Sequence, residues 1–258
     1  MNAAVGMRLF VTGGSGHIGS ALIPDLLAGG HTVVGLARSD ASASALMTAG
    51  VEVLRGSLDD VDRLAEAARA SDGVIHLAFK HELMAVGEFA RAAESDLRAV
   101  EAIGTALDGS RKPFVITSGT ALLAMAAPGR LVLETDVLEH GPRADSENTA
   151  IAMAARGVRS SVVRLPPTVH SSLDHHGFLP ALIGMARKNG ASVYVGDGAN
   201  RWPAVHTLDA ARLYRRAVES APAGTRLHGV ADEGRAVPTD RRSHRPRPGA
   251  STQDRLTG

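Results

Sequence analysis

The sequence predicts an α/β fold in which a doubly wound parallel sheet is covered by helices on both faces. Short, almost wholly apolar runs alternate along the chain with longer stretches of helical spacing, which is typical of strands buried on both faces. A glycine-rich turn at residues 12–19 joins the first apolar run to the first helical stretch, and a second apolar run follows at the distance that a βαβ unit requires.

Each expected element follows from this alternation. Strands are expected at residues 8–12, 31–36, 51–54, 73–78, 113–118, 159–164, 192–195 and 226–230. Helices are expected at residues 17–29, 41–49, 59–69, 86–108, 145–156, 178–188 and 208–219. Because the rhythm changes after residue 166, we expect residues 1–234 to form one domain in which residues 166–225 make up most of a small C-terminal substrate lobe.

The last stretch, residues 235–258, is rich in Arg and Pro, and its only large aliphatic residues are Val237 and Leu256. Such a composition cannot bury a core, so we expect this tail to be disordered. An alternative hypothesis is a frameshift that has removed a C-terminal helix. Residues 243–249, with GC-rich codons read one nucleotide later, can encode Arg-Ile-Gly-Arg-Gly-Leu-Gly. Resequencing the 3′ end of the gene distinguishes the two hypotheses.

The composition excludes several classes of function. A formal net charge of +1 gives no electrostatic reason to expect nucleic acid or a membrane surface as a partner. Without cysteine, the chain has no disulfide, no thiolate metal site and no cysteine nucleophile. No apolar stretch approaches the roughly 18 residues of a spanning helix, and residues 1–8 lack the pattern of a signal peptide. We therefore expect a cytoplasmic protein whose partner is a small-molecule substrate.

The glycine-rich turn reads Thr-Gly-Gly-Ser-Gly-His-Ile-Gly and has the character of a phosphate cradle. Its glycines allow a tight turn, a close approach of backbone to pyrophosphate, and close packing of the helix on the strand. The following helix offers free N–H groups and the positive end of its dipole to the anion. A Rossmann-type dinucleotide site is therefore expected, with contacts from Thr12, Gly13, Ser15, Gly16, His17, Ile18 and Gly19.

The end of the second strand indicates which dinucleotide is bound. Ala37 stands where an acidic residue would bind the adenine ribose, and Arg38 follows it. A guanidinium group can pair with a 2′-phosphate and stack on adenine, which favours NADP(H) over NAD(H). Ser39 is a second candidate ligand for that phosphate. The alternative is that Arg38 is an ordinary surface arginine.

More cofactor contacts are expected just after the next strands, because parallel sheets bind ligands at the carboxyl ends of their strands. Ser57 is expected to form a hydrogen bond with the adenine, and Leu58 is expected to pack against the base. Asp59 is expected to be the N-cap of the following helix. His76 is expected to be a hydrogen-bonded, partly buried histidine, and the small Ala78 suits close passage of the cofactor. The remaining expected contacts are Leu77, Phe79, Thr117, Pro166 and Thr168.

Several segments together resemble the extended short-chain dehydrogenase/reductases, the NAD-dependent epimerase/dehydratase group. They are residues 12–19, Gly56-Ser57-Leu58, His76-Leu77-Ala78, Thr117-Ser118, Arg164-Leu165-Pro166 and Trp-Pro-Ala-Val-His-Thr-Leu-Asp-Ala-Ala at residues 202–211. The resemblance runs from residue 7 to about residue 230. It implies a doubly wound sheet, a bound nicotinamide dinucleotide and a C-terminal substrate lobe. Because members of this group are often dimers, a homodimer is also an expectation.

The resemblance further implies a catalytic Tyr-x-x-x-Lys, which this chain lacks. Reduction of a carbonyl needs a proton donor at the oxygen, and a neighbouring lysine lowers the pKa of a tyrosine from about 10 toward neutrality. Neither Tyr194 nor Tyr214 has a lysine four residues later, and Arg143 and Glu147 stand where the pair would lie. The chain therefore resembles an atypical branch that keeps the cofactor fold without the usual catalytic residues.

Other residues are candidates for the missing chemistry. The family's serine would fall at or beside Gly119, which leaves Ser118 and Thr120 to bond a substrate oxygen. Lys80 and His81 directly follow the fourth strand, and either could protonate an alkoxide; an ordinary polar loop is the alternative.

Two more candidates come from elsewhere in the chain. His170 follows a loop that in the family passes the nicotinamide, and an ordinary loop histidine is again the alternative. Arg143 cannot donate a proton near neutral pH, but it could hold a carboxylate or phosphate, or pair with Glu147 on a helix surface.

The expected substrate lobe supplies further candidates. Arg201 and His206 are expected to contact substrate, whereas Trp202 is expected to be a packing anchor between lobes and Asp209 a helix N-cap. Residues 174–176, Asp-His-His, lack a third ligand at suitable spacing, so we expect a polar loop there and no metal.

The leading hypothesis is an NADP(H)-dependent oxidoreductase that acts on a small carbonyl or alcohol, with hydride supplied by the cofactor. One alternative is a non-catalytic NAD(P)-binding redox sensor or interaction protein, which the missing Tyr and Lys favour. Arg201, His206 and His170 favour the enzyme, because a sensor has less need of a substrate pocket. A sugar-nucleotide epimerase or dehydratase is a third hypothesis, weakened because that chemistry also relies on the missing tyrosine.

Overall fold

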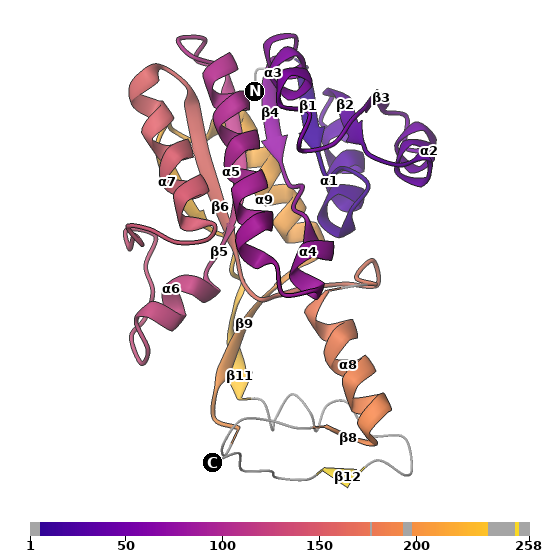
Figure 1. Cartoon of the computed structure of the whole chain (residues 1–258), viewed down its shortest axis with the longest axis vertical. Helices are drawn as coiled ribbons and strands as arrows, with labels where there is room; N and C mark the ends of the chain where they lie inside the picture. The colour runs from indigo at the N-terminus through magenta and orange to yellow at the C-terminus, as the bar shows by residue number, and fades with distance from the viewer. Residues whose placement is uncertain (1–5, 176, 193–197, 237–250, 253–258) are drawn as a thin grey trace.

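The computed structural model describes residues 6–175, 177–192, 198–236 and 251–252 (Figure 1). Seven parallel strands form its main sheet, namely β1 (Arg8–Thr12), β2 (Thr32–Ala37), β3 (Glu52–Arg55), β4 (Gly73–His76), β5 (Pro113–Gly119), β6 (Arg159–Leu165) and β10 (Thr225–His228). They lie in the order β10-β6-β5-β4-β1-β2-β3, so the strand order reverses between β1 and β4. In this register Thr12 lies opposite His76, at the carboxyl ends of their strands.

Helices precede or follow nearly every strand. They are α1 (His17–Ala28), α2 (Asp40–Thr48), α3 (Val61–Arg69), α4 (His81–Ala85), α5 (Phe89–Ala106), α6 (Ala121–Ala126), α7 (Ala144–Ala152), the 3₁₀ turn η1 (Met153–Arg156), α8 (Phe178–Asn189) and α9 (Thr207–Ser220).

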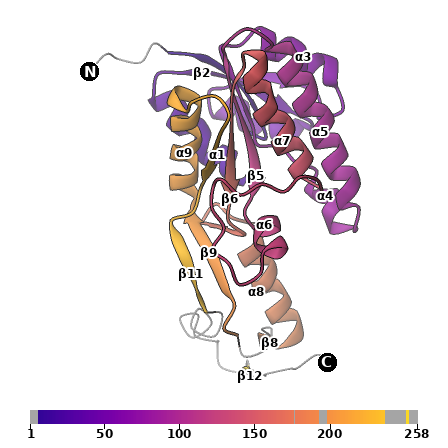
Figure 2. The same cartoon turned by 90° about the vertical axis from the view of Figure 1, so that its left-hand side faces the viewer.

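Two hydrophobic clusters, one on each face of the sheet, hold these layers together. On one face α1 and α9 pack Leu22 and Val218 in the same cluster as Leu9 of β1, and on the other α3 and α5 pack Leu64 and Val100 with strand side chains (Figure 2). Burial on both faces explains why the strands read as continuous apolar runs. The predicted doubly wound α/β fold is confirmed.

A smaller lobe lies beyond the carboxyl ends of the strands (Figures 1 and 2). Its sheet consists of β7 (Thr168–His170), β9 (Arg201–His206) and β11 (Asp232–Ala236), with β9 in the middle. The short strands β8 (Ala191–Ser192) and β12 (Ser251–Thr252) pair separately, and α8 stands beside this sheet.

Several element boundaries differ from the prediction. The helix expected at 86–108 begins later, as α5 at Phe89, and the short helix α4 that precedes it was not predicted. Gly87, with a φ of +81°, separates the two helices. Helix α6 and the lobe strands β7, β9 and β11 were not predicted. Within the tail, Arg235 and Ala236 complete β11 and residues 251–252 form β12. The rest of the tail and of the strand expected at 192–195 lies outside the described residues.

The glycine-rich turn connects β1 to α1 with almost no free space. Gly13 has a φ of +74°, a conformation that favours glycine. A Cβ on Gly19 would lie 2.2 Å from the carbonyl oxygen of Gly13, so helix α1 can pack against the turn only if position 19 has no side chain. Gly16 stands at the N-cap of α1 and donates its N–H to Gly13 O at 3.0 Å.

We predict that Gly19→Ala lowers the free energy of unfolding by about 2 kcal/mol or more, because the new methyl group collides with backbone that cannot move aside. Gly184→Ala is the matched control, since Gly184 lies inside α8 with nothing within 4 Å of the added Cβ. That change should stabilise the protein slightly, by up to about 1 kcal/mol. Urea unfolding measures both, and equal stabilities for the two variants would contradict the packing described for the turn.

Candidate active site

A chain of buried hydrogen bonds begins at the end of β1. Thr12 Oγ1 lies 2.8 Å from His76 Nδ1 and accepts the N–H of Ala78 at 3.2 Å, and His76 Nε2 lies 3.2 Å from Asp96 Oδ1. His76 therefore has a partner at each ring nitrogen, as the sequence predicted, and it is fully rather than partly buried. Asp96, on α5, receives the other end of this chain.

Asp96 also holds Arg143, the residue that stands in the tyrosine place. The Arg143 Nη1 donates to Asp96 Oδ1 at 3.2 Å, and its Nη2 donates to the carbonyl oxygen of Thr117. Burial opposes a charge on Asp96, but Arg143 and His76 hold the pKa of this carboxyl below its ordinary value. The Arg143 guanidinium is thus balanced by a carboxylate and is largely buried.

The ring of Phe79 contacts both Arg143 and a second candidate, His81. The Arg143 guanidinium carbon lies 4.4 Å from the centre of this ring, and the His81 ring packs edge-on against it at 5.5 Å. His81 is exposed at the surface, but partial desolvation of its ring and then the positive charge of Arg143 lower the pKa of this imidazole. Arg143, Phe79 and His81 therefore form one cluster at the carboxyl edge of the sheet, which we call the Arg143 cluster.

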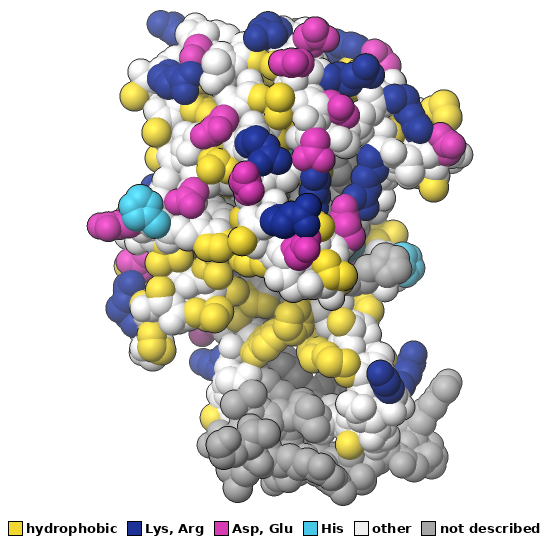
Figure 3. Space-filling model, viewed as in Figure 1, with side chains coloured by type: hydrophobic (Ala, Val, Ile, Leu, Met, Phe, Trp, Pro, Cys, Tyr) yellow, Lys and Arg dark blue, Asp and Glu magenta, His cyan; other side chains and the backbone are white. Residues whose placement is uncertain are grey.

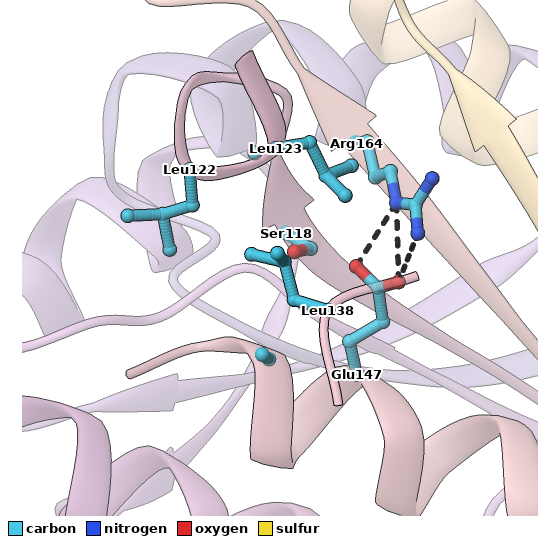
Figure 4. Close-up of a pocket in the computed structure, with 8 residues that line it drawn as sticks. Ser118, Leu122, Leu123, Leu138, Glu147 and Arg164 are labelled. Atoms are coloured by element: carbon cyan, nitrogen blue, oxygen red, sulfur yellow. Dashed lines mark hydrogen bonds and ion pairs between the residues drawn. The ribbon is translucent and has the colours of Figure 1, made fainter. Parts of the chain in front are cut away.

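Glu147, in the lysine place, faces a different set of partners (Figure 4). Its carboxylate accepts the Nε of the fully buried Arg164 at 3.1 Å and that of Arg226 at 2.7 Å. Burial opposes its charge, but hydrogen bonds from Arg164, Arg226 and Ser118 hold the pKa of Glu147 below its ordinary value. Arg164 also donates to the carbonyl oxygen of Asp136 at 2.7 Å, so this ion pair holds the segment between α6 and α7.

Ser118 and Thr120 form their hydrogen bonds with residues outside the Arg143 cluster. Ser118 lines a small pocket together with Leu122, Leu138 and Glu147 (Figure 4). The hydroxyl of Thr120 donates to the carbonyl oxygen of Leu165 at 3.4 Å. The structure therefore gives both hydroxyls partners within the protein.

Lys80 is bound to the residue expected to cap α3. Its Nζ lies 2.5 Å from Asp59 Oδ2, and Asp59 Oδ1 accepts the Ser95 hydroxyl at 3.0 Å. The expectation that Asp59 is the N-cap was wrong, because Asp60 occupies that position. The Ser57 hydroxyl donates to Asp60 at 3.1 Å, so this candidate adenine ligand also has a partner.

The residues expected near a 2′-phosphate lie on the surface beside α4. The Arg38 guanidinium is paired with Glu82, and both side chains are well exposed. Ser39 caps α2, accepting the N–H of Ser42 at 3.2 Å. Arg38 therefore has a carboxylate partner at one of its two terminal nitrogens.

The lobe brings two other candidates together. The rings of His170 and His206 lie 5.6 Å apart on the neighbouring strands β7 and β9. His206 caps α9 by accepting the N–H of Leu208 at 3.3 Å, so the expectation that Asp209 is this cap was wrong. Arg201 donates its Nε to the carbonyl oxygen of Gly234 at 3.1 Å.

Trp202 packs against α8, since its ring lies 4.5 Å from that of Phe178. Both residues belong to the small lobe, so this contact holds α8 on the lobe sheet and does not join the two lobes as the sequence predicted. Of the remaining expected cofactor contacts, Leu58 lies in the core and Ile18, Leu77 and Ala78 pack against it. Thr168 is buried in β7, while Pro166 follows β6 directly.

His17 joins three elements beside the glycine turn. Its Nε2 lies 2.7 Å from the Thr207 hydroxyl at the start of α9, and its Nδ1 lies 3.7 Å from Asp174 Oδ1. Asp174 thereby contacts the start of α1, while His176 lies outside the described residues.

Sequence reasoning missed Asp96, although a signal for it was present. On α5, Ala92, Asp96, Val100 and Ile103 follow one another at helical spacing on the buried face. A charged residue in such a row needs a buried partner of opposite charge, and Arg143 is that partner.

Within the described residues, no three His, Asp or Glu side chains are arranged to hold a metal ion. In the same part of the chain, none of the helices has the length and apolar character needed to cross a membrane.

Comparisons with known proteins show the family and the fold of this chain. The sequence model of the NAD dependent epimerase/dehydratase family matches residues 9–228. An uncharacterized protein of Schizosaccharomyces pombe is 45% identical over 230 residues, which cover 88% of this chain and 76% of that protein. A 4-hydroxy-2-methyl-3-oxo-4-farnesyl-3,4-dihydroquinoline-1-oxide ketoreductase of Stigmatella aurantiaca is 30% identical over 194 residues, which cover 70% of this chain and 55% of that enzyme.

Among solved structures, the dTDP-glucose 4,6-dehydratase DesIV of Streptomyces venezuelae, solved with NAD bound, superposes with a TM-score of 0.76. The two sequences are 21% identical, and the match covers 96% of this chain and 84% of that one. At this identity the likeness shows a shared fold.

We predict that Glu147→Gln lowers the free energy of unfolding by about 3–5 kcal/mol at pH 7, because it leaves the buried Arg164 without its counter-charge. Asp209→Asn is the control, since Asp209 and Arg212 form an exposed pair whose loss should change stability by less than about 1 kcal/mol. Urea unfolding compares the two.

The pH dependence gives a second readout of the same pair. The pKa of Glu147 is lowered in the folded protein. Its carboxylate therefore contributes fully to the free energy of unfolding above the ordinary pKa of 4.5, and this contribution is lost as the pH falls from 4.5 through the lowered pKa. Glu147→Gln should therefore lose less stability than the wild type between pH 5 and pH 3. Parallel acid-unfolding curves for the two proteins would contradict a charged, buried Glu147.

Proposed function

Because the chain belongs to the NAD dependent epimerase/dehydratase family, we propose that it is an NADP(H)-dependent oxidoreductase that acts on a carbonyl or alcohol. The observation that carries this proposal is the Arg143 cluster, which presents a guanidinium and an imidazole at the carboxyl edge of the sheet, where the family's tyrosine would stand. The ketoreductase of Stigmatella aurantiaca among its relatives supports a reductase.

The glycine turn fits a dinucleotide. A Cβ on Gly13 would lie 2.7 Å from the N of Ala78, and one on Gly19 would collide with Gly13, so the turn is bare backbone at the N-terminus of α1. The free N–H groups of that terminus suit a pyrophosphate. Thr12, Gly13, Ser15 and Gly16 would hold it, with Phe79 and Thr117 nearer the reacting end. When bound, the dinucleotide supplies or accepts the hydride.

Arg38 supports the choice of NADP(H). The last residue of β2 is Ala37 and not an acidic residue, and the exposed guanidinium of Arg38 comes directly after it. A 2′-phosphate would compete with Glu82 for this guanidinium, and a dianion with several acceptor oxygens is the stronger partner. NADP(H) is therefore the proposed cofactor.

Arg143 would orient the substrate. Asp96 and Thr117 take one N–H from each of its two terminal nitrogens, and the guanidinium has five N–H groups in total. A remaining N–H can donate to the carbonyl oxygen of a substrate and stabilise the negative charge that forms there. Because Asp96 already balances its charge, Arg143 suits a neutral carbonyl oxygen better than the carboxylate or phosphate that the sequence also allowed.

His81 would provide the proton. During reduction, hydride adds to the carbonyl carbon, the C=O π pair moves to oxygen, and that oxygen takes a proton from the His81 imidazolium. The lowered pKa of His81 makes its protonated form a stronger acid. Lys80, the other candidate beside β4, is held by Asp59 instead.

A protein that binds NADP(H) without catalysis is the second candidate. The observation that favours it is the role of Glu147. This residue fills the lysine place, and its buried ion pair with Arg164 stabilises the fold. Binding of NADPH without reduction of any carbonyl compound would select this candidate. A sugar-nucleotide epimerase, the third hypothesis, lacks its tyrosine here.

We predict that Arg38→Ala raises the Kd for NADPH at least about tenfold and leaves the Kd for NADH unchanged, because a lost charge-assisted hydrogen bond costs roughly 1.5–3 kcal/mol. Glu82→Gln should tighten NADPH binding, since it frees Arg38. Arg91→Ala, which removes another exposed arginine paired with a glutamate, is the control. Titration calorimetry gives the constants, and equal NADPH affinity in wild type and Arg38→Ala would reject the phosphate role.

We also predict that Arg143→Met lowers kcat/KM for carbonyl reduction by roughly 10²-fold or more while NADPH still binds. Because this change alone leaves Asp96 buried without its cation, the double variant R143M/D96N is measured beside it. Reduction is followed as NADPH oxidation over a panel of aldehydes and ketones.

His81→Gln is the companion variant. If His81 is the acid, wild-type kcat/KM for reduction falls as pH rises through a pKa below 6.5, and His81→Gln loses this dependence. Full activity of R143M/D96N, or an unaltered pH profile in His81→Gln, would show that another group does this chemistry.

A further inference from the structure

Exposed apolar side chains gather where the molecule narrows between the nucleotide-binding part and the lobe (Figure 3). Within the described residues, the large exposed hydrophobic residues other than Met47 and Leu208 belong to α4, α6, α8 or the segments that adjoin them. We call this set the apolar waist: Met84, Val86, Met125, Leu131, Leu133, Val137, Leu173, Phe178, Leu182, Ile183 and Met185. An apolar surface of this extent is unusual on a protein that binds nothing there.

Two helices that carry residues of the apolar waist begin at the carboxyl edge of the main sheet, next to the Arg143 cluster. Helix α4 starts at His81, inside the Arg143 cluster, and α6 follows the end of β5 with only Thr120 between them. Helices α6 and α8 stand on opposite sides of the waist (Figure 1). Phe178, at the start of α8, is supported by Trp202. A molecule whose carbonyl reaches Arg143 would therefore lay the rest of its body along apolar side chains.

The cations nearest this edge already have partners. Arg143 is bound to Asp96, Arg164 to Glu147 and Arg130 to Asp136 at 3.0 Å. Arg201 donates to a backbone carbonyl in β11. In the described part of α8, Arg187 and Lys188 lie in the last turn, at the end away from the sheet. Among these four arginines in the described residues, Arg201 is the one whose partner is not a carboxylate. A nucleotide diphosphate brings at least two negative charges, which this single guanidinium would have to balance.

We infer that the substrate is an uncharged ketone or aldehyde with a large apolar body, and that the apolar waist is its binding surface. This inference rests on the proposed function and narrows its substrate class. Removal of apolar surface from water would supply the affinity, and the Arg143 N–H would supply the orientation. Sugar nucleotides would bind poorly, because their charge and hydroxyl groups would lose water without gaining partners.

Prodan, a naphthyl ethyl ketone whose fluorescence shifts to shorter wavelength in apolar surroundings, is a suitable probe. It should bind the wild type at micromolar concentration with its emission shifted, and UDP-glucose at millimolar concentration should leave the signal unchanged. Prodan binding is measured with and without NADPH, and NADPH binding is measured separately. Loss of prodan binding alone would contradict the inferred substrate class, whereas loss of NADPH binding would contradict the proposed function.

Leu133→Glu places a charge on the segment between α6 and α7, and Leu182→Glu places one on α8, at side chains that are 50% and 39% exposed. Each should raise the prodan Kd tenfold or more while the melting temperature and the NADPH Kd stay at wild-type values. Met47→Glu is the matched control, because Met47 is 62% exposed on α2, outside the waist. It should bind prodan like the wild type.

Three results would overturn the inference. The first is a wild type that binds NADPH and reduces short aldehydes but does not bind prodan. The second is displacement of prodan by UDP-glucose. The third is sedimentation showing that the wild type is a dimer which Leu133→Glu dissociates, because the waist would then be covered by a second copy of the chain.

Discussion

The ion pair between the buried Asp96 carboxylate and Arg143 is the interaction on which the rest of the site depends. A charge can stay inside this protein only because the Arg143 guanidinium and the His76 ring face it. That requirement fixes the start of α7, where Arg143 takes a left-handed φ of +69°, a conformation that costs energy for a residue with a side chain. Through His76 it also reaches Thr12, where the glycine turn begins, so one hydrogen-bonded chain connects the proposed cofactor cradle to the proposed catalytic arginine.

Arg143 and Glu147 occupy the places of the family's tyrosine and lysine, but they do not act as a pair. They are four residues apart, yet Arg143 faces α5 and the end of β5, whereas Glu147 faces β6 and β10. The lysine place has thus become a structural ion pair, and no cation is left there to lower the pKa of a neighbouring hydroxyl. Any surviving hydride chemistry must obtain its proton elsewhere, and in our proposal His81 provides it.

The main sheet could be predicted because its strands are buried on both faces and therefore read as apolar runs. The lobe strands could not, since β9 includes Pro203 and a mixture of polar and apolar residues whose pairing is set by β7 and β11, far away in the sequence. The glycine turn was visible because its shape demands particular residues. The partners of Arg143 were not, because an ion pair between α5 and the start of α7 leaves no local pattern except an acidic residue on a buried helix face. The cap predictions for Asp59 and Asp209 failed because α3 begins one residue later, after Asp60, and α9 begins earlier, after His206, whose side chain makes the capping hydrogen bond.

The central claim is that the chain transfers hydride with an arginine where the family has a tyrosine, and the transferred hydrogen itself is the most direct test. NADPH carrying deuterium at one or the other C4 position is incubated with the protein and prodan or smaller carbonyl compounds, and the alcohol product is analysed by mass spectrometry. Our account predicts one deuterium from one of the two labelled cofactors, and none with R143M/D96N. NADPH that binds to the wild type but never delivers deuterium to any carbonyl compound would contradict it.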